Sequence, residues 1–204
     1  MTEKKKANRD LEFLYEVGAL RLIPRQWQRF HLYHVQNLAE HHFRVIWIAL
    51  IIAAREGKGD VEKIMKMALV HDVAESRTGD VDYIARQYVD RHEDVALEHI
   101  LDQTPLKDEF LKLWREYENK ESIEAKIVKD ADNLDVDMDI REQGSNGHGL
   151  EKDWSKYREL VGERKLYTNA GKQIFKEITT SNPNDWHVFS PFNRINGGDW
   201  KPKS

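Results

Sequence analysis

Apolar and polar positions alternate along most of the chain with the three- and four-residue spacing of an amphipathic helix. The clearest example covers residues 38–55, which are apolar on nearly every side in their second half. Asn37 and Glu40 precede this run with the spacing of a capping box, and Gly57 marks its end. The pattern therefore predicts a long helix at the centre of the domain.

Similar patterns follow one another through the rest of the chain. They predict further helices over residues 10–20, 60–71, 81–103, 105–117, 124–142 and 150–180. We find no strand pattern of useful length, no internal repeat and no linker. The sequence therefore predicts a single all-α domain that spans residues 10–182.

The two ends of the chain differ from this pattern. Residues 1–9 are polar, and we expect them to be flexible. Residues 183–204 are rich in Asn, Gly and Pro, which predicts an irregular C-terminal tail. This tail also contains aromatic residues, which disordered tails usually lack: Trp186, Phe189, Phe192 and Trp200. We therefore expect it to pack on its own domain or on a neighbouring subunit.

The amino-acid composition excludes some kinds of metal site and some classes of protein. The chain has 204 residues and no Cys, so disulfides and thiolate metal sites are excluded. A net charge of −4 without a basic stripe argues against binding a nucleic-acid polymer. No apolar run is long enough to span a membrane, and the first residues lack an apolar signal core. We therefore expect a cytoplasmic protein that binds no membrane.

One stretch, residues 67–80, begins as an apolar helical run and then turns abruptly into titratable groups. His71 followed by Asp72 is costly on a buried segment unless both groups are paired or hold a metal. Glu75 lies four residues after His71, so the two side chains can lean toward one side of a helix. Gly79 breaks the helix and directs Asp80 back toward its end. This combination indicates a functional site.

Two other predicted helices supply matching ligands. His41 and His42 lie in the first turn of the central helix, and Asp132 follows an apolar approach in residues 127–131. Together with His71 and Asp72, they offer nitrogen and oxygen ligands for a single divalent ion. Such a set suits Mn, Co, Fe, Ni, Zn or Mg.

These residues resemble the pattern of the HD-domain metal-dependent phosphohydrolases, and within them the bacterial 5′-deoxynucleotidases and their relatives. The family pattern is an early His, a His-Asp pair and a distant Asp that together bind one metal; the matching residues here are His41, His71, Asp72 and Asp132. The nucleotidase branch adds His-Asp-x-x-Glu-x-x-x-Gly-Asp, carried here by His71, Asp72, Glu75, Gly79 and Asp80. The resemblance covers about residues 11–142. It implies an HD-type helical bundle with the metal site between central helices.

The nucleotidase branch also has an Arg with a nearby Trp ahead of the first His. Arg25 and Trp27 resemble this feature, although Gln26 separates them here. The resemblance implies hydrolysis of a nucleoside 5′-monophosphate, with a 2′-deoxy sugar preferred. Arg25 would clamp phosphate oxygens, Trp27 would pack on the nucleoside, and Glu75 would activate or position the water. Asp80 would contact the sugar hydroxyl or assist the leaving oxygen.

Some assignments stay open at this point. His34 is an alternative early ligand, but it precedes the predicted helix, so His41 fits better. His92 and His99 lie where two-metal members of the superfamily place extra ligands; otherwise they belong to a solvent-exposed helix. Asp135 stands where relatives often carry an acid, and we expect Asp139 and Glu142 to form a solvated stripe.

The function also has alternatives. One is a related HD hydrolase that cuts a nucleoside triphosphate or a pyrophosphate alarmone. The other is a non-catalytic binding module in which the metal is a structural staple. Glu75 argues against the latter, because a structural site needs no acid beyond its ligands. Since relatives are often dimers, the resemblance also implies a homodimer.

Overall fold

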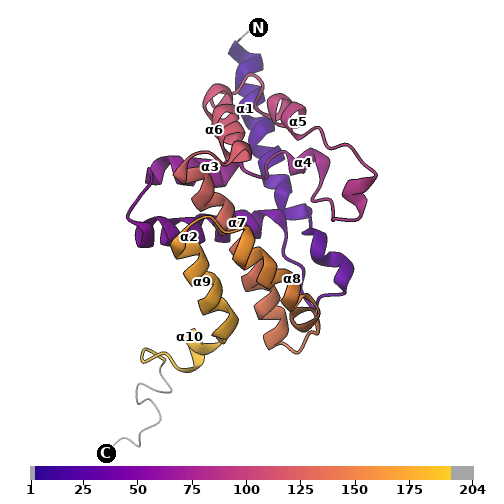
Figure 1. The fold of residues 1–204 in the computed structure, drawn as a ribbon. Helices are drawn as coiled ribbons and strands as arrows, with labels where there is room; N and C mark the ends of the chain where they lie inside the picture. The colour runs from indigo at the N-terminus through magenta and orange to yellow at the C-terminus, as the bar shows by residue number, and fades with distance from the viewer. Residues whose placement is uncertain (1–2, 194–204) are drawn as a thin grey trace, which may run out of the picture.

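The computed structural model of the protein describes residues 3–193, and these residues fold into helices joined by short loops (Figure 1). The helices are α1 (Glu3–Gly18), α2 (Leu38–Glu56), α3 (Val61–Val70), α4 (Glu75–Thr78), α5 (Glu93–Leu101), α6 (Lys107–Asn119), α7 (Ile123–Ser145), α8 (Leu150–Arg164), α9 (Asn169–Thr180) and α10 (Asp185–Val188). Short 3₁₀ turns are η1 (Ala19–Leu22), η2 (Gln26–Phe30) and η3 (Ala85–Gln87). Within the described residues, β pairing is limited to one bridge between Pro24 and Asn37. The all-α prediction is confirmed.

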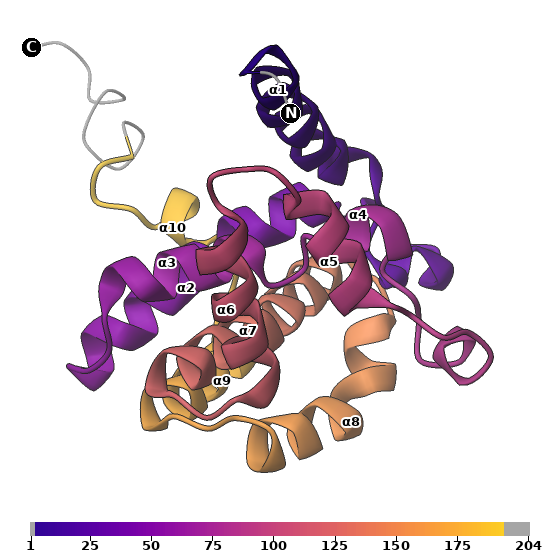
Figure 2. The same ribbon diagram turned by 90° about the horizontal axis from the view of Figure 1, so that it is seen from above.

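Helices α2 and α7 form the centre of the molecule. Helix α7 packs on α2, α3, α6, α8 and α9, while α2 also packs on α3 (Figures 1 and 2). The buried residues of α2 that face the core repeat every three or four positions: Val45, Ile48, Ala49 and Ile52. Those of α7 follow the same spacing: Ile127, Val128, Ala131 and Leu134. The core therefore lies between these helices, as the apolar run predicted.

The predicted capping box sets the start of α2. The Asn37 side chain accepts a hydrogen bond from the Glu40 backbone N–H at 3.0 Å, and the Glu40 carboxylate accepts one from the Asn37 N–H at 3.0 Å. A side-chain cap of this kind stabilises a helix by about 1 kcal/mol. Because α2 begins at Leu38, His41 lies one turn inside the helix and points into the core, where it is fully buried.

The single helix predicted over residues 150–180 is wrong, since the structure has two helices. Helix α8 ends at Arg164, and α9 begins after its cap Thr168. The buried Asp130 of α7 accepts hydrogen bonds from the backbone N–H groups of Tyr167 and Thr168 at 2.8 and 2.7 Å. This contact holds the connection in a non-helical conformation, so α9 can turn back along α7.

The helix predicted over residues 81–103 is also shorter than expected, because its first half is a loop. The Asp82 carboxylate accepts hydrogen bonds from the backbone N–H groups of Ile84 and Ala85, which is an alternative to helical pairing. Only a short 3₁₀ turn forms there, and α5 starts at Glu93. The loop brings Arg86 and Arg91 beside the site described below.

At the N-terminus, α1 begins at Glu3 and not at Asp10 as the pattern predicted. Phe13 and Val17 are the α1 residues that pack on the core. The other apolar residues of the pattern, Leu11, Leu14 and Tyr15, are 54–79 % exposed. The apolar face of this helix is therefore only partly covered.

The tail after α9 carries the short helix α10, at the end of the molecule opposite α1 (Figure 1). Trp186, Phe189 and Phe192 are 72–92 % exposed, so they do not pack on their own domain. Trp200 lies outside the described residues. Among residues 3–193, no helix is long and apolar enough to cross a membrane.

Candidate metal centre and active site

The four predicted ligands meet at one point. His41 comes from α2, His71 and Asp72 from the turn after α3, and Asp132 from α7, and their ligand atoms lie within 4.8 Å of one another. His41 Nε2 is 3.2 Å from His71 Nε2, 3.5 Å from Asp72 Oδ2 and 3.3 Å from Asp132 Oδ1. Three separate segments of the chain thus bring two imidazoles and two carboxylates together.

The turn after α3 directs its ligands into the cluster. The stretch was predicted as one helix, but α3 stops at Val70 and the short helix α4 begins at Glu75. The apolar residues Met67 and Val70 are buried, which anchors the end of α3 in the core. His71 is 2 % exposed and therefore points inward from this anchor.

Hydrogen bonds fix which imidazole nitrogens face the cluster. His71 Nδ1 lies 2.7 Å from the Ala68 carbonyl oxygen, which can only accept, so Nδ1 carries a proton. His41 Nδ1 lies 2.6 Å from Oδ2 of the buried Asp135, which likewise favours a proton on Nδ1. Burial lowers the pKa of His71, so its ring stays neutral and its Nε2 lone pair faces the cluster.

This arrangement fits a divalent cation. Burial and Arg25 lower the pKa of His41, but Asp135 and Asp132 outweigh them and raise it well above its usual range, so its Nε2 carries a proton 3.2 Å from His71 Nε2. A cation bound at this point would displace that proton and be bound by the Nε2 lone pairs of both rings. Burial raises the pKa of Asp72, but His71 and His41 outweigh it and hold that pKa below its usual range, so the carboxylate is ionised. The four side chains therefore form a group that can hold one divalent ion, whose identity stays open.

Residues named as alternatives lie outside this group. His42 is buried against the His71 ring, 4.6 Å between ring centroids, but its Nε2 has no partner among the described residues. His34 has a side chain that is 77 % exposed, so it is not an early ligand. His92 is the N-cap residue of α5 and His99 lies on that helix, and both are exposed, as the alternative to a second metal site expected. The described residues contain no second ligand cluster there.

Glu75 lies beside the cluster and is 5 % exposed. Its Oε1 is 3.6 Å from Arg91 Nη1, and its Oε2 has no hydrogen-bond partner among the described residues. Burial, followed by the Asp72 and Asp80 carboxylates, raises the pKa of Glu75 to about 10. A buried carboxyl group with an unpartnered oxygen is well placed to exchange a proton with a bound molecule.

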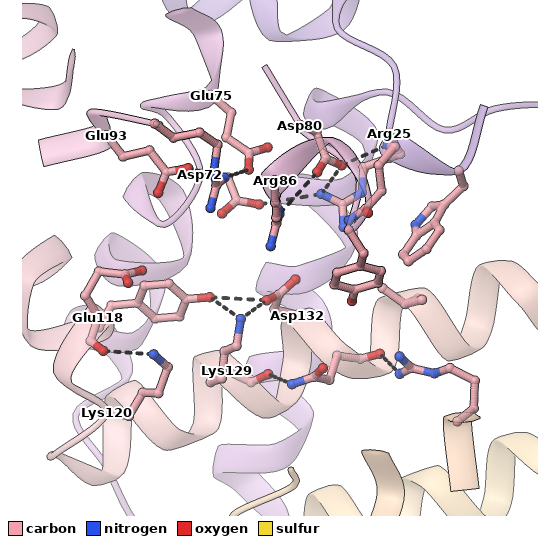
Figure 3. Close-up of a pocket in the computed structure, with 18 residues that line it drawn as sticks. Arg25, Asp72, Glu75, Asp80, Arg86, Glu93, Glu118, Lys120, Lys129 and Asp132 are labelled. Carbon is pink, nitrogen blue, oxygen red and sulfur yellow. Dashed lines mark hydrogen bonds and ion pairs between the residues drawn. The ribbon is translucent and has the colours of Figure 1, made fainter. Parts of the chain in front are cut away.

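Arg25 reaches the cluster from the extended segment before α2. The bridge between Pro24 and Asn37 and a hydrogen bond from Arg25 N to Gln36 O hold this segment in place. Arg25 Nη1 is 3.1 Å from Asp80 Oδ2 and 3.6 Å from Asp72 Oδ2 (Figure 3). The guanidinium is almost fully buried beside the cluster.

Asp80 and Trp27 line the same pocket from further out. Asp80 Oδ2 also accepts a hydrogen bond from the Gln26 N–H at 3.0 Å, and its position follows the turn at Gly79, where φ is +73°. Trp27 is only 3 % exposed and packs edge-on against Trp154, with ring centroids 4.8 Å apart. Trp27 therefore shapes the pocket wall and offers little free ring surface.

The pocket over the cluster has a volume of about 200 Å³. Besides the predicted residues, it is lined by basic side chains that the pattern did not assign: Arg86, Arg91, Lys120, Lys129 and Arg158. Lys129 and the Tyr117 hydroxyl donate hydrogen bonds to Asp132 Oδ2 at 2.7 and 3.2 Å. Figure 3 shows Lys129 beside Asp132, on the side of the pocket away from Arg25. The position of Lys129, one turn before Asp132, is the signal that could have found it.

The acids of α7 are more buried than expected. Asp135 is fully buried and supports His41, as its position suggested. Asp139 is 6 % exposed, so the solvated stripe is wrong for this residue, and burial raises its pKa to about 6. Glu142 is partly exposed and binds Arg44 at 2.7 Å. Arg44 also binds Asp135, which explains how α2 and α7 share these charges.

Comparison with known proteins agrees with this geometry. A family model described as "HD domain" matches residues 17–166. The 5′-deoxynucleotidase HDDC2 of Danio rerio is 36 % identical over 138 residues, covering 65 % of this chain and 68 % of the relative. The human 5′-deoxynucleotidase HDDC2 is 32 % identical over 138 residues and covers 65 % and 67 %.

Solved structures share the fold. A conserved hypothetical protein from Pyrococcus furiosus has a TM-score of 0.69 at 26 % identity, covering 84 % of this chain and 99 % of the other. A predicted metal-dependent phosphohydrolase from Magnetospirillum magnetotacticum has a TM-score of 0.67 at 21 % identity, covering 85 % and 93 %. The HD phosphohydrolase DatZ of cyanophage S-2L has a TM-score of 0.52 at 20 % identity, covering 82 % and 96 %. With four side chains that can hold one metal ion, a helical fold and a family match over most of its length, the chain belongs to the HD domain family.

Proposed function

We propose that the protein is a metal-dependent phosphohydrolase that removes the 5′-phosphate from (deoxy)nucleoside monophosphates. The observation that carries this proposal is the His41–His71–Asp72–Asp132 cluster, which opens directly into a pocket beside Arg25. A metal cluster next to a buried guanidinium suits a substrate phosphate. The 5′-deoxynucleotidases among its relatives support the nucleotide part of the proposal.

The cluster residues would hold one divalent ion. Such an ion lowers the pKa of a bound water and offsets the charge that develops on a phosphoryl group. Asp135 and the Ala68 carbonyl would keep Nε2 of both histidines available by holding protons on Nδ1. The protein thereby orients the ligands before any ion arrives.

Arg25 would bind the remaining phosphate oxygens. Its planar guanidinium already lies 3.1–3.6 Å from Asp80 and Asp72, so it is held in place and close to the cluster. Asp80 would contact the sugar hydroxyl or assist the leaving O5′ atom. Trp27 would limit the pocket on the nucleoside side, because its ring packs into the wall.

Glu75 would accept a proton from the attacking water or position that water. In the reaction, the water oxygen forms a bond to phosphorus, the bond from phosphorus to O5′ breaks, and O5′ gains a proton. Burial, followed by repulsion from Asp72 and Asp80, raises the pKa of Glu75 to about 10. Positive charge placed next to Asp72 favours the ionised carboxylate, as this role requires.

The alternatives make different predictions for substrate. An HD hydrolase of nucleoside triphosphates or of a pyrophosphate alarmone would release little phosphate from monophosphates. A non-catalytic metal-stapled module would release none. Glu75 argues against the staple, because it is buried beside the cluster with an unpartnered oxygen and belongs to no structural ion pair closer than 3.6 Å.

The experiment is a panel of nucleoside mono-, di- and triphosphates with Mn, Co and Mg tested in parallel. We expect release of phosphate from monophosphates, and Glu75→Gln should slow it at least about a hundredfold while metal content stays unchanged. Glu93→Gln is the matched control, because Glu93 also contacts Arg91 in the pocket. Full activity of the metal-loaded Glu75→Gln protein would refute the role of Glu75. Turnover confined to triphosphates would refute the substrate class.

We also propose a homodimer, which an exposed stripe on α2 supports. Phe43, Trp47 and Ile51 are four residues apart and 51–67 % exposed, so they line one face of the helix. Light scattering after gel filtration should give a dimer for the native chain and a monomer for Trp47→Glu. Tyr88→Glu, at another exposed aromatic residue in residues 81–92, should stay dimeric. A monomeric native chain would contradict the proposal.

A cytoplasmic location and the boundaries 10–182 for the HD domain stay predictions. The residues matched by the family model, 17–166, lie within those boundaries.

A further inference from the structure

A second, larger groove lies next to the pocket over the cluster of four candidate metal ligands. Its volume is about 590 Å³, compared with about 200 Å³ for the pocket itself. The two share five lining residues, so they form one continuous depression: Tyr83, Lys120, Lys129, Asn133 and Arg158. The groove continues along α8 to Tyr167, beyond the end of that helix. A ligand bound at the cluster can therefore extend into it.

The groove is basic, whereas the pocket contains both charges. Five cationic side chains line the groove, and no carboxylate does: Lys120, Lys129, Arg158, Arg164 and Lys165. Lys129 pairs with Asp132, and Arg158 pairs with Asp137. Among the described residues, Arg164 and Lys165 have no ion-pair partner, and both are exposed. The groove thus has positive charge that the protein itself does not neutralise.

Three tyrosines stand among these cations. Tyr83, Tyr157 and Tyr167 are 44–47 % exposed, so each keeps part of its ring free. Tyr83 lies between pocket and groove, with its ring centroid 6.2 Å from both Trp27 and Tyr157. Exposed aromatic rings beside basic side chains are typical of surfaces that bind the bases and phosphates of nucleotides.

We infer that this groove binds a second phosphate group, attached to the 3′ side of the nucleotide whose 5′-phosphate lies at the cluster. The inference rests on the proposed function for the position of the first phosphate. A nucleoside monophosphate carries its charge only on that phosphate, and its base is neutral. A base alone therefore does not account for the unpaired Arg164 and Lys165. Nucleoside 3′,5′-bisphosphates and 5′-phosphorylated dinucleotides both carry the required second phosphate.

The test compares binding of three ligands: dAMP, deoxyadenosine 3′,5′-bisphosphate and the dinucleotide pdApdA. Calorimetry uses the manganese-loaded Glu75→Gln protein, in which the ligands persist. We expect both larger ligands to bind about tenfold more tightly than dAMP, the gain typical of a charge-assisted contact. Tighter binding of the dinucleotide than of the bisphosphate would show that the tyrosines stack its second base; equal binding would show that the phosphate alone is recognised.

Variants separate the groove from a general charge effect. Arg164→Gln combined with Lys165→Gln should reduce the preference for the larger ligands to about twofold or less. Lys156→Gln is the matched control, because Lys156 is exposed on α8 outside the groove. It should keep the full preference.

The inference is overturned if neither larger ligand binds more tightly than dAMP, if the double variant keeps the preference, or if Lys156→Gln loses it. Phosphate release from dAMP by the unsubstituted enzyme tests the proposed function separately. A protein that hydrolyses dAMP without preferring the larger ligands would retain the proposed function and lose only this groove. A protein that prefers the larger ligands without hydrolysing dAMP would retain the groove and lose the proposed function.

Discussion

Replacing Asp135 by Asn should weaken metal binding although Asp135 is not a ligand. Asp135 accepts hydrogen bonds from three donors: His41 Nδ1 at 2.6 Å, Gln36 Nε2 at 3.4 Å and Arg44 Nε. Both of its oxygens are therefore in use. An Asn side chain has one oxygen and one NH₂ group, so in either orientation a donor faces another donor.

The size of the effect follows from which donor is left facing the amide. If the NH₂ group faces His41, the ring proton moves to Nε2, and the lone pair that faces the cluster is lost. If it faces Arg44, that guanidinium loses its side-chain contact with residue 135 and keeps its contacts with Glu142 at 2.7 and 2.8 Å. Loss of a partner that orients a metal-ligating His typically weakens metal binding about 10–100-fold. That corresponds to about 1.4–2.7 kcal/mol.

Calorimetric titration with Mn²⁺ at neutral pH measures this loss. Asp130→Asn is the matched control, because Asp130 is another buried acid of α7 that accepts from several donors, near Thr168 and away from the ligands. Both substitutions should destabilise the protein by about 1–3 kcal/mol, but only Asp135→Asn should change metal affinity. Unchanged Mn²⁺ affinity in Asp135→Asn would refute the view that Asp135 sets the His41 tautomer.

Arg25→Ala should lower kcat/KM for a monophosphate about a hundredfold while the protein keeps its metal. Arg25→Lys should recover only part of the lost kcat/KM. Native activity in Arg25→Ala would place the phosphate site elsewhere. Burial raises the pKa of Asp139 from 3.8 to about 6. The folded state therefore binds this proton more tightly than the unfolded state does, and the free energy of unfolding falls as pH rises from about 4 to 6. Asp139→Asn should then stabilise the protein by up to about 3 kcal/mol at pH 8 and by much less at pH 4. Equal stabilisation at both pH values, measured by urea denaturation, would contradict this. Gly162→Ala should lower the free energy of unfolding in urea by about 1–3 kcal/mol, because a Cβ there would lie 2.4 Å from the Phe175 ring. Gly149→Ala is the control, because its Cβ would meet nothing closer than 4.0 Å. Equal losses in the two variants would refute the packing argument.

Local patterns in the sequence predicted the central helices of the fold and identified the four candidate ligands. Asn37 and Glu40 form the capping box that starts α2, so the sequence placed His41 correctly in the first turn of that helix. His71 and Asp72 follow an apolar run that is buried, and Asp132 follows another. Each of these features depends on neighbours within a few positions, which is why spacing alone could identify them.

Features set by distant contacts were not predictable from spacing. The break between α8 and α9 depends on Asp130, which lies 37 residues before Tyr167. The loop that carries Arg86 and Arg91 has a helical pattern, but Asp82 binds the backbone instead. These basic residues of the pocket were therefore missed for the same reason that the helix over residues 81–103 was too long.

Helix α7 connects these observations, because four of its acids contact groups from different parts of the chain. Asp130 holds the connection to α9, Asp132 belongs to the metal cluster, and Asp135 supports His41 of α2. Asp137 binds Arg158 of α8 through two hydrogen bonds of 2.6 and 2.8 Å, and Arg158 lines both the pocket and the basic groove. Burial of so many carboxylates is costly unless each is paired. The pairing therefore fixes α2, α8 and α9 on one helix, and it places the metal cluster and the basic groove at a constant separation, as a ligand that bridges both would require.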